Sequence, residues 1–404
     1  MAPPKTSPRP LDGLRVIDLT SIIFGPLATQ NLTEMGAEVI KVEAPGGDIF
    51  RHIEPMRSGG MSSVFMNSNR GKQSIVLDLK SDGGRDALMR LVETGDVFIH
   101  SMRGKAAERL GIGYDAIRAV KPEIVYCFAC GYGSKGPNAE LPAYDDIIQA
   151  ASGLASVTPL PDGTPQLVRS VAADKISALY LTNALMGAIL TLKTTGQGQY
   201  VEVPMFESMV HFMMVEHLCA ASFEPPVGPA GYKRVLSESR QVYRTKDSFA
   251  VMLPYTTAQW QRFFEVVGET ELAAADWVND AGARSKRIDE LYSFIASVAP
   301  SRTTAEWVSE LRRIEVPAAA VNSLDDLFEH PQSKASGIFE DYNHPSEGKL
   351  RGTRSPFRLN DDGPAPCAPL LGENTRDVLA GIGFSDSDID TLISEGGAWQ
   401  ADSK

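Results

Sequence analysis

The sequence contains little that would place the chain in a membrane or outside the cell. No run of eighteen apolar residues occurs, so no membrane-spanning helix is predicted. Residues 1–10 are rich in proline and lack the apolar core of a secretory signal, which predicts a disordered tail. Four cysteines among 404 residues are too few for a disulfide framework. We therefore predict a cytoplasmic protein that has no membrane partner.

An excess of positive charge is also missing. The formal net charge of -12 argues against a general affinity for nucleic acid or anionic lipid, although a local basic patch can still bind a phosphorylated ligand. A hydrophobic share of 43% with 22% charged residues is ordinary for a globular chain. The length exceeds what one hydrophobic core usually supports, so two domains or one elaborated domain are predicted.

Spacings that would indicate metal, redox or serine-hydrolase chemistry are absent as well. The six histidines show no ligand spacing, and no Ser-His-Asp or Cys-His set can be read from the sequence. They are His52, His100, His211, His217, His330 and His344. Cys127 and Cys130 form a CxxC inside a predicted strand, where residues three apart point to opposite faces. Buried thiols are therefore favoured over a redox pair or half a zinc site, and no metal site is predicted.

The pattern from Gly131 to Gly136 (GYGSKG) fits the dinucleotide fingerprint in its letters only. That fingerprint needs a helix that begins at once and whose amides hold a pyrophosphate. Pro137 and Pro142 interrupt any such helix, so a tight turn is favoured over a nicotinamide or flavin site.

What the first half of the chain does contain is an alternation of strands and helices. Strands are predicted at residues 14–19, 38–43, 74–79, 96–100 and 123–130. Helices are predicted at 26–35 and 84–94, followed by Gly36 and Gly95, the residue type that best tolerates a left-handed helix end. This alternation predicts an α/β fold with a mostly parallel sheet covered on both faces.

The second half predicts two long helices and then a change of character. Residues 175–193 are apolar on nearly every face, as in a buried helix, and a second helix is predicted at 205–221. A proline-rich linker follows at 224–229. Beyond it we predict paired strands within 241–253 and helices at 257–267, 286–296 and 303–313. Residues 341–366 are predicted to be extended, and two short helices at 374–381 and 387–394 finish the chain.

Two groups of polar residues are candidates for chemistry. Asp174 stands before the long apolar helix, where an aspartate caps the free amides and is held ionised by the helix dipole. On spacing alone capping is the favoured interpretation, and a catalytic carboxylate is compatible with it. Arg103, Lys105 and Arg109 follow a predicted strand, where cations suit the phosphates of a nucleotide-like ligand or are simply solvated.

Several segments, in order along nearly the whole chain, resemble the family III CoA transferases, the group of formyl-CoA and carnitine CoA transferases. The segments are 11–19 (LDGLRVIDL), 25–26 (GP), 35–43 (MGAEVIKVE), 67–72 (NSNRGK), 77–80 (LDLK), 144–146 (YDD), 149–154 (QAASGL), 195–199 (TGQGQ) and 369–375 (PLLGENT). Each is modest alone, and their order and spacing together are specific.

The resemblance implies that Asp174 is the nucleophile, because the family's aspartate opens a helix twelve residues after an Asp-Gly turn and Asp162-Gly163 stands there. It implies a mixed anhydride and an aspartyl-CoA thioester as intermediates. The substrates would be a CoA thioester, with succinyl-CoA as a candidate donor, and a small carboxylic acid. No permanently bound cofactor is implied.

The resemblance also implies the other site residues. Contacts with CoA are expected from Arg103, Lys105, Arg109, Gly25 and Asn69. Weaker expectations for the bound acid are Tyr144 and Asp145, with capping of the helix that follows as the alternative role of Asp145. Apart from the resemblance, Arg169 and Arg240 are candidates for holding a second carboxylate, and surface charge is an equally good interpretation of both. The family's glycine-rich loop has no counterpart at residues 237–240 (SESR), which argues against formyl or oxalate specificity.

Two other activities are weighed against transfer. The family includes α-methylacyl-CoA racemases, which need an acid and a base. Their histidine is replaced here by Tyr144, so transfer is favoured over racemisation. A CoA-binding relative without activity is a third possibility.

The fold implied by the resemblance is a large Rossmann-like domain and a smaller α+β domain, in open-ring subunits that interlock as a homodimer. The expected bounds are a tail at 1–10, the large CoA-binding domain at 11–221, a linker at 222–232 and the small domain at 233–325. A returning linker at 326–372 and C-terminal helices at 373–404 that pack on the large domain complete the chain.

Overall fold

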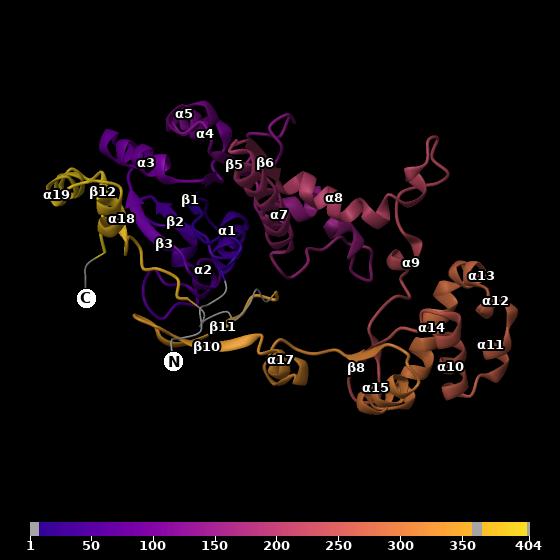
Figure 1. Ribbon diagram of the computed structural model, residues 1–404. Helices are drawn as coiled ribbons and strands as arrows, with labels where there is room; N and C mark the ends of the chain where they lie inside the picture. Colours follow the sequence, from indigo (N-terminus) through magenta and orange to yellow (C-terminus); the bar gives the residue numbers. More distant parts are fainter. Residues whose placement is uncertain (1–7, 358–365, 402–404) are drawn as a thin grey trace. The chain divides into compact units, whose positions relative to one another are not determined.

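The computed structural model describes residues 8–357 and 366–401, which form two compact units (Figure 1). The larger unit holds the chain up to Met213 and again from Ser336, and the smaller unit is Met214–Ala335. Most of the predicted tail lies outside the described residues. Arg9 is bonded to Asp12, so ordered contacts begin before residue 11.

A seven-stranded sheet forms the centre of the larger unit. Its strands are β1 (Arg15–Leu19), β2 (Glu38–Glu43), β3 (Gln73–Leu77), β4 (Val97–His100), β5 (Val125–Cys130), β6 (Tyr200–Pro204) and β12 (Ala398–Trp399). The order is β12-β3-β2-β1-β4-β5-β6, and every neighbouring pair is parallel except β12 with β3. The predicted mostly parallel sheet is confirmed, and β6 and β12 are strands that the sequence did not predict.

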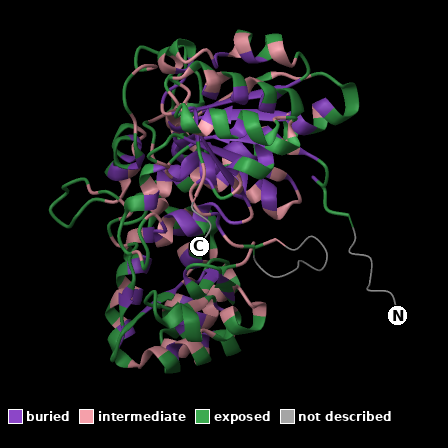
Figure 2. Ribbon diagram, turned by 90° about the vertical axis from the view of Figure 1, so that its left-hand side faces the viewer, coloured by how far each residue is buried: buried purple, intermediate pink, exposed green. Residues whose placement is uncertain are grey.

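Side chains alternate between the two faces of this sheet and feed two apolar cores. One core joins Val16, Val97 and Cys127 to helices α1 (Phe24–Glu34) and α7 (Ala172–Thr195). The other joins Ile17, Phe98 and Cys130 to helices α3 (Asp82–Thr94), α5 (Tyr114–Val120), α18 (Thr375–Gly381) and α19 (Asp386–Ser394). Buried residues accordingly gather along the strands (Figure 2). Cys127 and Cys130 are free thiols on opposite faces, and burial raises the pKa of both. The buried-thiol interpretation of the CxxC is confirmed.

The helices of the larger unit connect these strands, as crossover connections between parallel strands require. They are α1 (Phe24–Glu34), α2 (Ser63–Ser68), α3 (Asp82–Thr94), α4 (Gly104–Arg109), α5 (Tyr114–Val120), α6 (Asp145–Ala151), α7 (Ala172–Thr195), α18 (Thr375–Gly381) and α19 (Asp386–Ser394), with α8 (Met205–His217) and α17 (Pro331–Ser336) at the boundaries between the units. Short 3₁₀ turns occur at Ile49–His52 and Leu154–Val157. Gly36 has the expected positive φ of 108°, whereas the prediction for Gly95 is wrong, since its φ of -85° is extended backbone.

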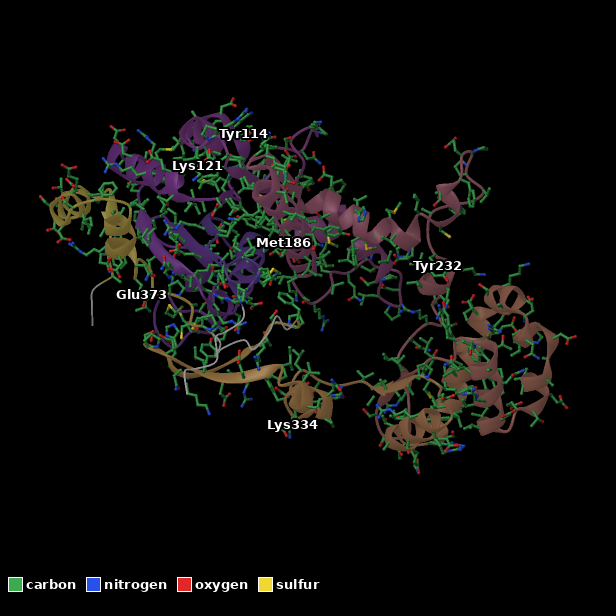
Figure 3. The ribbon with its side chains drawn as sticks, in the orientation of Figure 1. Tyr114, Lys121, Met186, Tyr232, Lys334 and Glu373 are labelled. Carbon is green, nitrogen blue, oxygen red and sulfur yellow. The ribbon has the colours of Figure 1, made fainter. Side chains whose placement is uncertain are left out.

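Helix α7 is long and apolar enough, by length and composition, to cross a membrane. In the larger unit it lies against α1 and the sheet, and Met186 on this helix is partly buried against the core (Figure 3). The expectation of burial on nearly every side is wrong for one face, where Leu179 and Leu190 are 59% and 65% exposed.

The turn after β5 contains the GYGSKG pattern and leads to no immediate helix, as predicted. Farther along, the stretch predicted to be extended contains the hairpin β10 (Phe339–His344) and β11 (Gly348–Thr353). Residues 358–365 of that stretch lie outside the described residues.

The smaller unit combines a short antiparallel sheet with helices. The strands are β7 (Tyr243–Arg244), β8 (Phe249–Met252) and β9 (Ala318–Ala320), and the helices are α9 (Lys233–Leu236), α10 (Thr257–Val267), α11 (Thr270–Ala274), α12 (Asp276–Asn279), α13 (Ala281–Lys286), α14 (Ile288–Val298), α15 (Thr304–Arg313) and α16 (Asp326–Glu329), with 3₁₀ turns at Cys219–Ser222 and Ala299–Ser301. Trp260, Phe263 and Trp307 are at most 1% exposed and form its core. The paired strands and the three predicted helices are confirmed.

Candidate active site

A pocket of about 380 Å³ opens where four parallel strands of the larger unit end. Its wall is made of residues that follow β1, β4, β5 and β6, together with the start of α7. They are Ser21, Ile22, Phe24, Ser101, Met102, Arg103, Ala106, Phe128, Ala129, Cys130, Gly131, Ala139, Leu141, Pro142, Ala143, Tyr144, Asp174 and Met205. Strand β1 pairs with β2 on one side and β4 on the other, so the sheet order reverses here. Open α/β sheets bind their ligands at this switch point.

Asp174 lines the pocket from the first turn of α7. It is the third residue of the helix, and the N-cap is Val171, which makes no side-chain capping bond. The interpretation of Asp174 as the helix cap is therefore wrong. Its side chain is largely withdrawn from water, because the residue is only 5% exposed.

The backbone at Asp174 is fixed by a carboxylate from the neighbouring helix α6. The Asp174 amide donates to Asp145 Oδ1 at 3.0 Å, and Gln149 Nε2 donates to Asp145 Oδ2 at 2.6 Å. Gln149 also holds the segment before α7, residues 168–170. It donates to the Ser170 carbonyl at 3.0 Å and accepts from the Val168 amide at 2.8 Å. Asp145 thus satisfies a free amide of α7 from outside the helix. It is 6% exposed and supports the pocket from behind rather than lining it, contrary to expectation.

These surroundings raise the pKa of the Asp174 carboxyl to about 7. Burial is the main cause, and the negative charges of Asp145 and then Asp146 add to it. Burial and these negative charges therefore outweigh the helix dipole, which was expected to keep this carboxylate ionised. A carboxyl that titrates near neutral pH and faces a pocket is a strong candidate for chemistry.

The other residues expected to hold CoA fall into two groups. Arg103 is exposed and lines the pocket, and Lys105 and Arg109 are exposed on α4 just beyond it. Gly25 and Asn69, in contrast, are buried structural residues. A side chain on Gly25 would place its Cβ 2.3 Å from that of Thr20.

Asn69 is fully buried and its polar atoms are occupied. Its Nδ2 donates to the Phe65 carbonyl at 3.0 Å, and its Oδ1 accepts from Lys72 Nζ at 2.8 Å. Lys72 in turn reaches Asp18 at 3.1 Å. Asn69 therefore belongs to a buried network of ion pairs and hydrogen bonds. We do not propose that it contacts CoA.

Of the other residues expected to contact the bound acid, only one lines the pocket. Tyr144 lines the pocket and is 62% exposed. Arg169 is exposed in the segment before α7 and does not line the pocket. Arg240 is an exposed residue of the smaller unit.

Sequence reasoning missed Ser21, Ile22, Gly131 and Met205 in the pocket wall. The rule that ligands bind beyond the carboxyl ends of parallel strands would have found Ser21, Ile22 and Gly131, since each lies within three residues of the end of a predicted strand. Met205 could not be found in this way, because it follows β6, which was not predicted. Gln149 was part of a recognised segment, but only the folded structure shows the bonds that it makes. Among residues 8–357 and 366–401, no group of three His, Cys, Asp or Glu is arranged to hold a metal ion.

The chain is similar to named CoA transferases over most of its length. The family model described as CoA-transferase family III matches residues 11–375. The succinate–glutarate CoA-transferase of Agrobacterium fabrum is 30% identical over 384 residues, which cover 92% of this chain and 95% of that protein. The succinyl-CoA:glutarate CoA-transferase of Mus musculus is 31% identical, with 98% and 92% covered.

Solved structures agree with the sequence comparison. The crystal structure of the Mycobacterium tuberculosis protein Rv3272 has a TM-score of 0.80 and 27% identity, and covers 91% of this chain and 98% of that one. A CaiB/BaiF family protein from Brucella suis has a TM-score of 0.78 and 28% identity, with 93% and 100% covered. The chain belongs to CoA-transferase family III and is an enzyme of the CoA-transferase type.

Proposed function

We propose that the enzyme moves CoA from an acyl-CoA to a carboxylic acid, with Asp174 as the covalent nucleophile. The observation that carries this proposal is the position of Asp174, a buried carboxyl in the wall of the pocket at the switch point of the sheet. Several relatives are named for succinyl-CoA with glutarate or mesaconate. We therefore propose succinyl-CoA as donor and a small carboxylic acid as acceptor.

The first half of the proposed reaction transfers CoA onto the enzyme. An oxygen of ionised Asp174 attacks the thioester carbonyl carbon, the C–S bond breaks, and CoA leaves as thiolate from a mixed anhydride. The thiolate then attacks the Asp174 carbonyl carbon, so the donor acid departs as carboxylate and an aspartyl-CoA thioester remains. A carboxylate needs no base to activate it, and two acyl steps replace one difficult exchange.

The second half reverses these steps with the acceptor. The acceptor carboxylate attacks the aspartyl thioester and displaces CoA thiolate, which gives a second mixed anhydride. The thiolate attacks the acceptor carbonyl carbon and restores free Asp174. No proton is gained or lost overall, which suits a site where Asp174 faces a pocket with an otherwise mainly apolar wall.

An exchange assay tests this function. The enzyme is incubated in D₂O with succinyl-CoA and a panel of dicarboxylic and monocarboxylic acids, and separately with a branched 2-methylacyl-CoA, and the CoA esters are identified by mass spectrometry. New acyl-CoAs from the added acids support transfer. Deuterium at the α-carbon of a branched acyl-CoA without exchange indicates a racemase, and binding without turnover indicates a CoA-binding relative. Either of these two results would overturn the proposal.

The pKa of Asp174 predicts how the rate depends on pH. The nucleophile is the ionised form, so kcat/KM for acyl-CoA should fall roughly tenfold per pH unit below about pH 7. The Asp146→Asn variant removes an exposed charge that raises this pKa, so its acid limb should lie at lower pH. The measurement is kcat/KM from pH 5 to 9 for both proteins. A wild-type kcat/KM that stays level down to pH 5, as the ordinary aspartate pKa of 3.8 would give, would contradict the assignment.

We also propose a homodimer, since α7 carries an apolar face that this chain leaves open. Leu179 and Leu190 lie eleven residues apart, about three helical turns, on one face of α7, and both are more than half exposed. A second copy would bury them, and interlocking open rings would do so with a large interface. Sedimentation velocity is expected to give a dimer at micromolar concentration. A monomer at that concentration would contradict the proposal.

The predicted domain bounds, with linkers at 222–232 and 326–372, and the cytoplasmic location stay part of the proposal. They are supported by the return of the chain to the larger unit from Ser336 and by four free cysteines.

A further inference from the structure

Ile22, in the wall of the pocket, has a backbone conformation that a branched residue rarely adopts. Its φ is +74°, in the left-handed region that favours glycine. Its side chain is branched at Cβ, which makes this conformation more crowded still. Cys219 and Glu315 are the other non-glycine residues with positive φ in the described chain, and neither lines the pocket. Strain of this kind persists where surrounding contacts impose it, and it gathers at functional sites.

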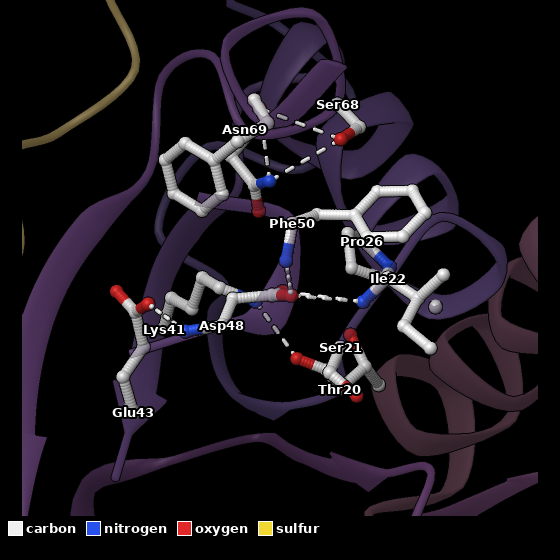
Figure 4. Close-up of polar contacts among 12 residues, drawn as sticks. Thr20, Ser21, Ile22, Pro26, Lys41, Glu43, Asp48, Phe50, Ser68 and Asn69 are labelled. Atoms are coloured by element: carbon white, nitrogen blue, oxygen red, sulfur yellow. Dashed lines mark hydrogen bonds and ion pairs between the residues drawn. The ribbon is translucent and has the colours of Figure 1, made fainter. Parts of the chain in front are cut away.

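The contact that fixes Ile22 is a buried carboxylate. The Ile22 amide donates to both oxygens of Asp48, each at 3.2 Å (Figure 4). Two positions earlier, the carbonyl of Thr20 accepts from Lys41 Nζ at 2.8 Å. Asp48 and Lys41 therefore hold the turn between β1 and α1 at two points.

These two residues also hold each other. Lys41 Nζ lies 3.0 Å from Asp48 Oδ2, and both side chains are at most 1% exposed. Asp48 accepts a further bond from the Phe50 amide at 3.0 Å. A buried ion pair is costly to desolvate and adds little net stability, so its use is better sought in the geometry that it fixes.

A further contact of the turn reaches the opposite side of the switch point. The Ser21 amide donates to Ser101 Oγ at 3.2 Å, and Ser101 follows β4. Ser21, Ile22 and Ser101 all line the pocket. The conformation of this turn consequently decides the shape of the pocket on the side of β1.

We infer that Asp48 and Lys41 are a positioning pair for acyl-CoA binding, which holds Ile22 in its left-handed conformation and so sets one wall of the pocket. Neither residue lines the pocket, so the pair acts through Ile22. The inference rests on the proposed function, because it takes this pocket to be the acyl-CoA site.

The first test replaces Ile22 itself. In Ile22→Gly the strain and the side chain are both lost, so KM for acyl-CoA should rise about tenfold while kcat stays within about threefold. Its melting temperature should not fall, because glycine accepts the conformation. The control is Glu315→Gly, another left-handed residue, in the smaller unit, which should leave KM unchanged. An unchanged KM in Ile22→Gly would overturn the inference.

The second test asks whether the pair acts through Ile22. The double variant Lys41→Met with Asp48→Asn removes both charges and should raise KM for acyl-CoA by a similar factor. Adding Ile22→Gly to it should then cause little further rise, because coupled residues are not additive. If the double variant does not fold, Asp48→Asn alone replaces it in the same cycle. Multiplicative effects would overturn the inference.

These outcomes are distinct from failure of the proposed function. If Asp174→Ala is inactive while the Ile22 cycle is multiplicative, the positioning role fails and the transfer mechanism stands. If Asp174→Ala keeps full exchange activity, the proposed mechanism fails whatever the Ile22 variants do.

Discussion

Replacing Asp174 by asparagine should lower the rate of CoA transfer by at least about 1000-fold, the order expected when a covalent nucleophile is removed. Asparagine has nearly the shape of aspartate, and its amide is a poor nucleophile because its lone pair is delocalised. Asp174 is buried and its backbone amide donates a hydrogen bond to Asp145, which the substitution keeps, so the backbone geometry is expected to be unchanged. The measurement is the steady-state rate of acyl-CoA formation from succinyl-CoA and an acceptor acid.

A matched variant shows whether the loss is specific. Asp115 is an exposed acid in the first turn of α5, outside the pocket wall. Asp115→Asn makes the same chemical change at the start of a helix and is expected to keep the wild-type rate. Binding of acyl-CoA by Asp174→Asn should also be kept. A rate within tenfold of wild type in Asp174→Asn would contradict the role of Asp174.

The same Asp174→Asn variant should be more stable than the wild type at pH 8. The pKa of Asp174 is raised from 3.8 to about 7 by folding, so the folded state resists ionisation of this carboxyl. The resulting penalty begins as pH rises above 3.8 and is complete above about 7, where it amounts to about 4 kcal/mol at most. Asparagine does not ionise, so the variant does not have this penalty.

Denaturant unfolding at a series of pH values tests whether ionisation of Asp174 lowers the stability of the folded state. The gain of Asp174→Asn over wild type should be small near pH 4, grow between pH 4 and 7, and stay level above pH 8. A gain that does not change with pH would assign the effect to packing. A loss of stability at pH 8 would show that the carboxylate is stabilised by its surroundings, contrary to the raised pKa.

The sheet was largely predictable because its signals are local. Strand β2 has the predicted bounds, Glu38–Glu43, and α10 has the predicted bounds Thr257–Val267, since each is a short periodic segment with clear ends. Strand β6 was missed because its pairing depends on β5, some seventy residues earlier, and β12 has only two residues. The left-handed conformation predicted for Gly95 was wrong, because a glycine after a helix permits such a turn without requiring it.

The candidate nucleophile could be predicted from the sequence, but the pKa of that residue and the backbone strain in the pocket wall could not. Asp174 was identified from its distance to Asp162-Gly163 and the family segments around it. Its pKa depends on burial and on Asp145, which is 29 residues away and reaches it only in the folded chain. The strain at Ile22 likewise depends on Asp48, and nothing in the local sequence at Ile22 indicates a positive φ.

The covalent role of Asp174 is tested most directly by trapping the enzyme during turnover. The protein is mixed with succinyl-CoA alone, quenched in acid, digested and analysed by mass spectrometry. We predict CoA attached as a thioester to the peptide that contains Asp174, lost on adding acceptor acid and absent from Asp174→Asn. An adduct on another residue, or rapid CoA transfer with no adduct at Asp174, would contradict the proposed mechanism.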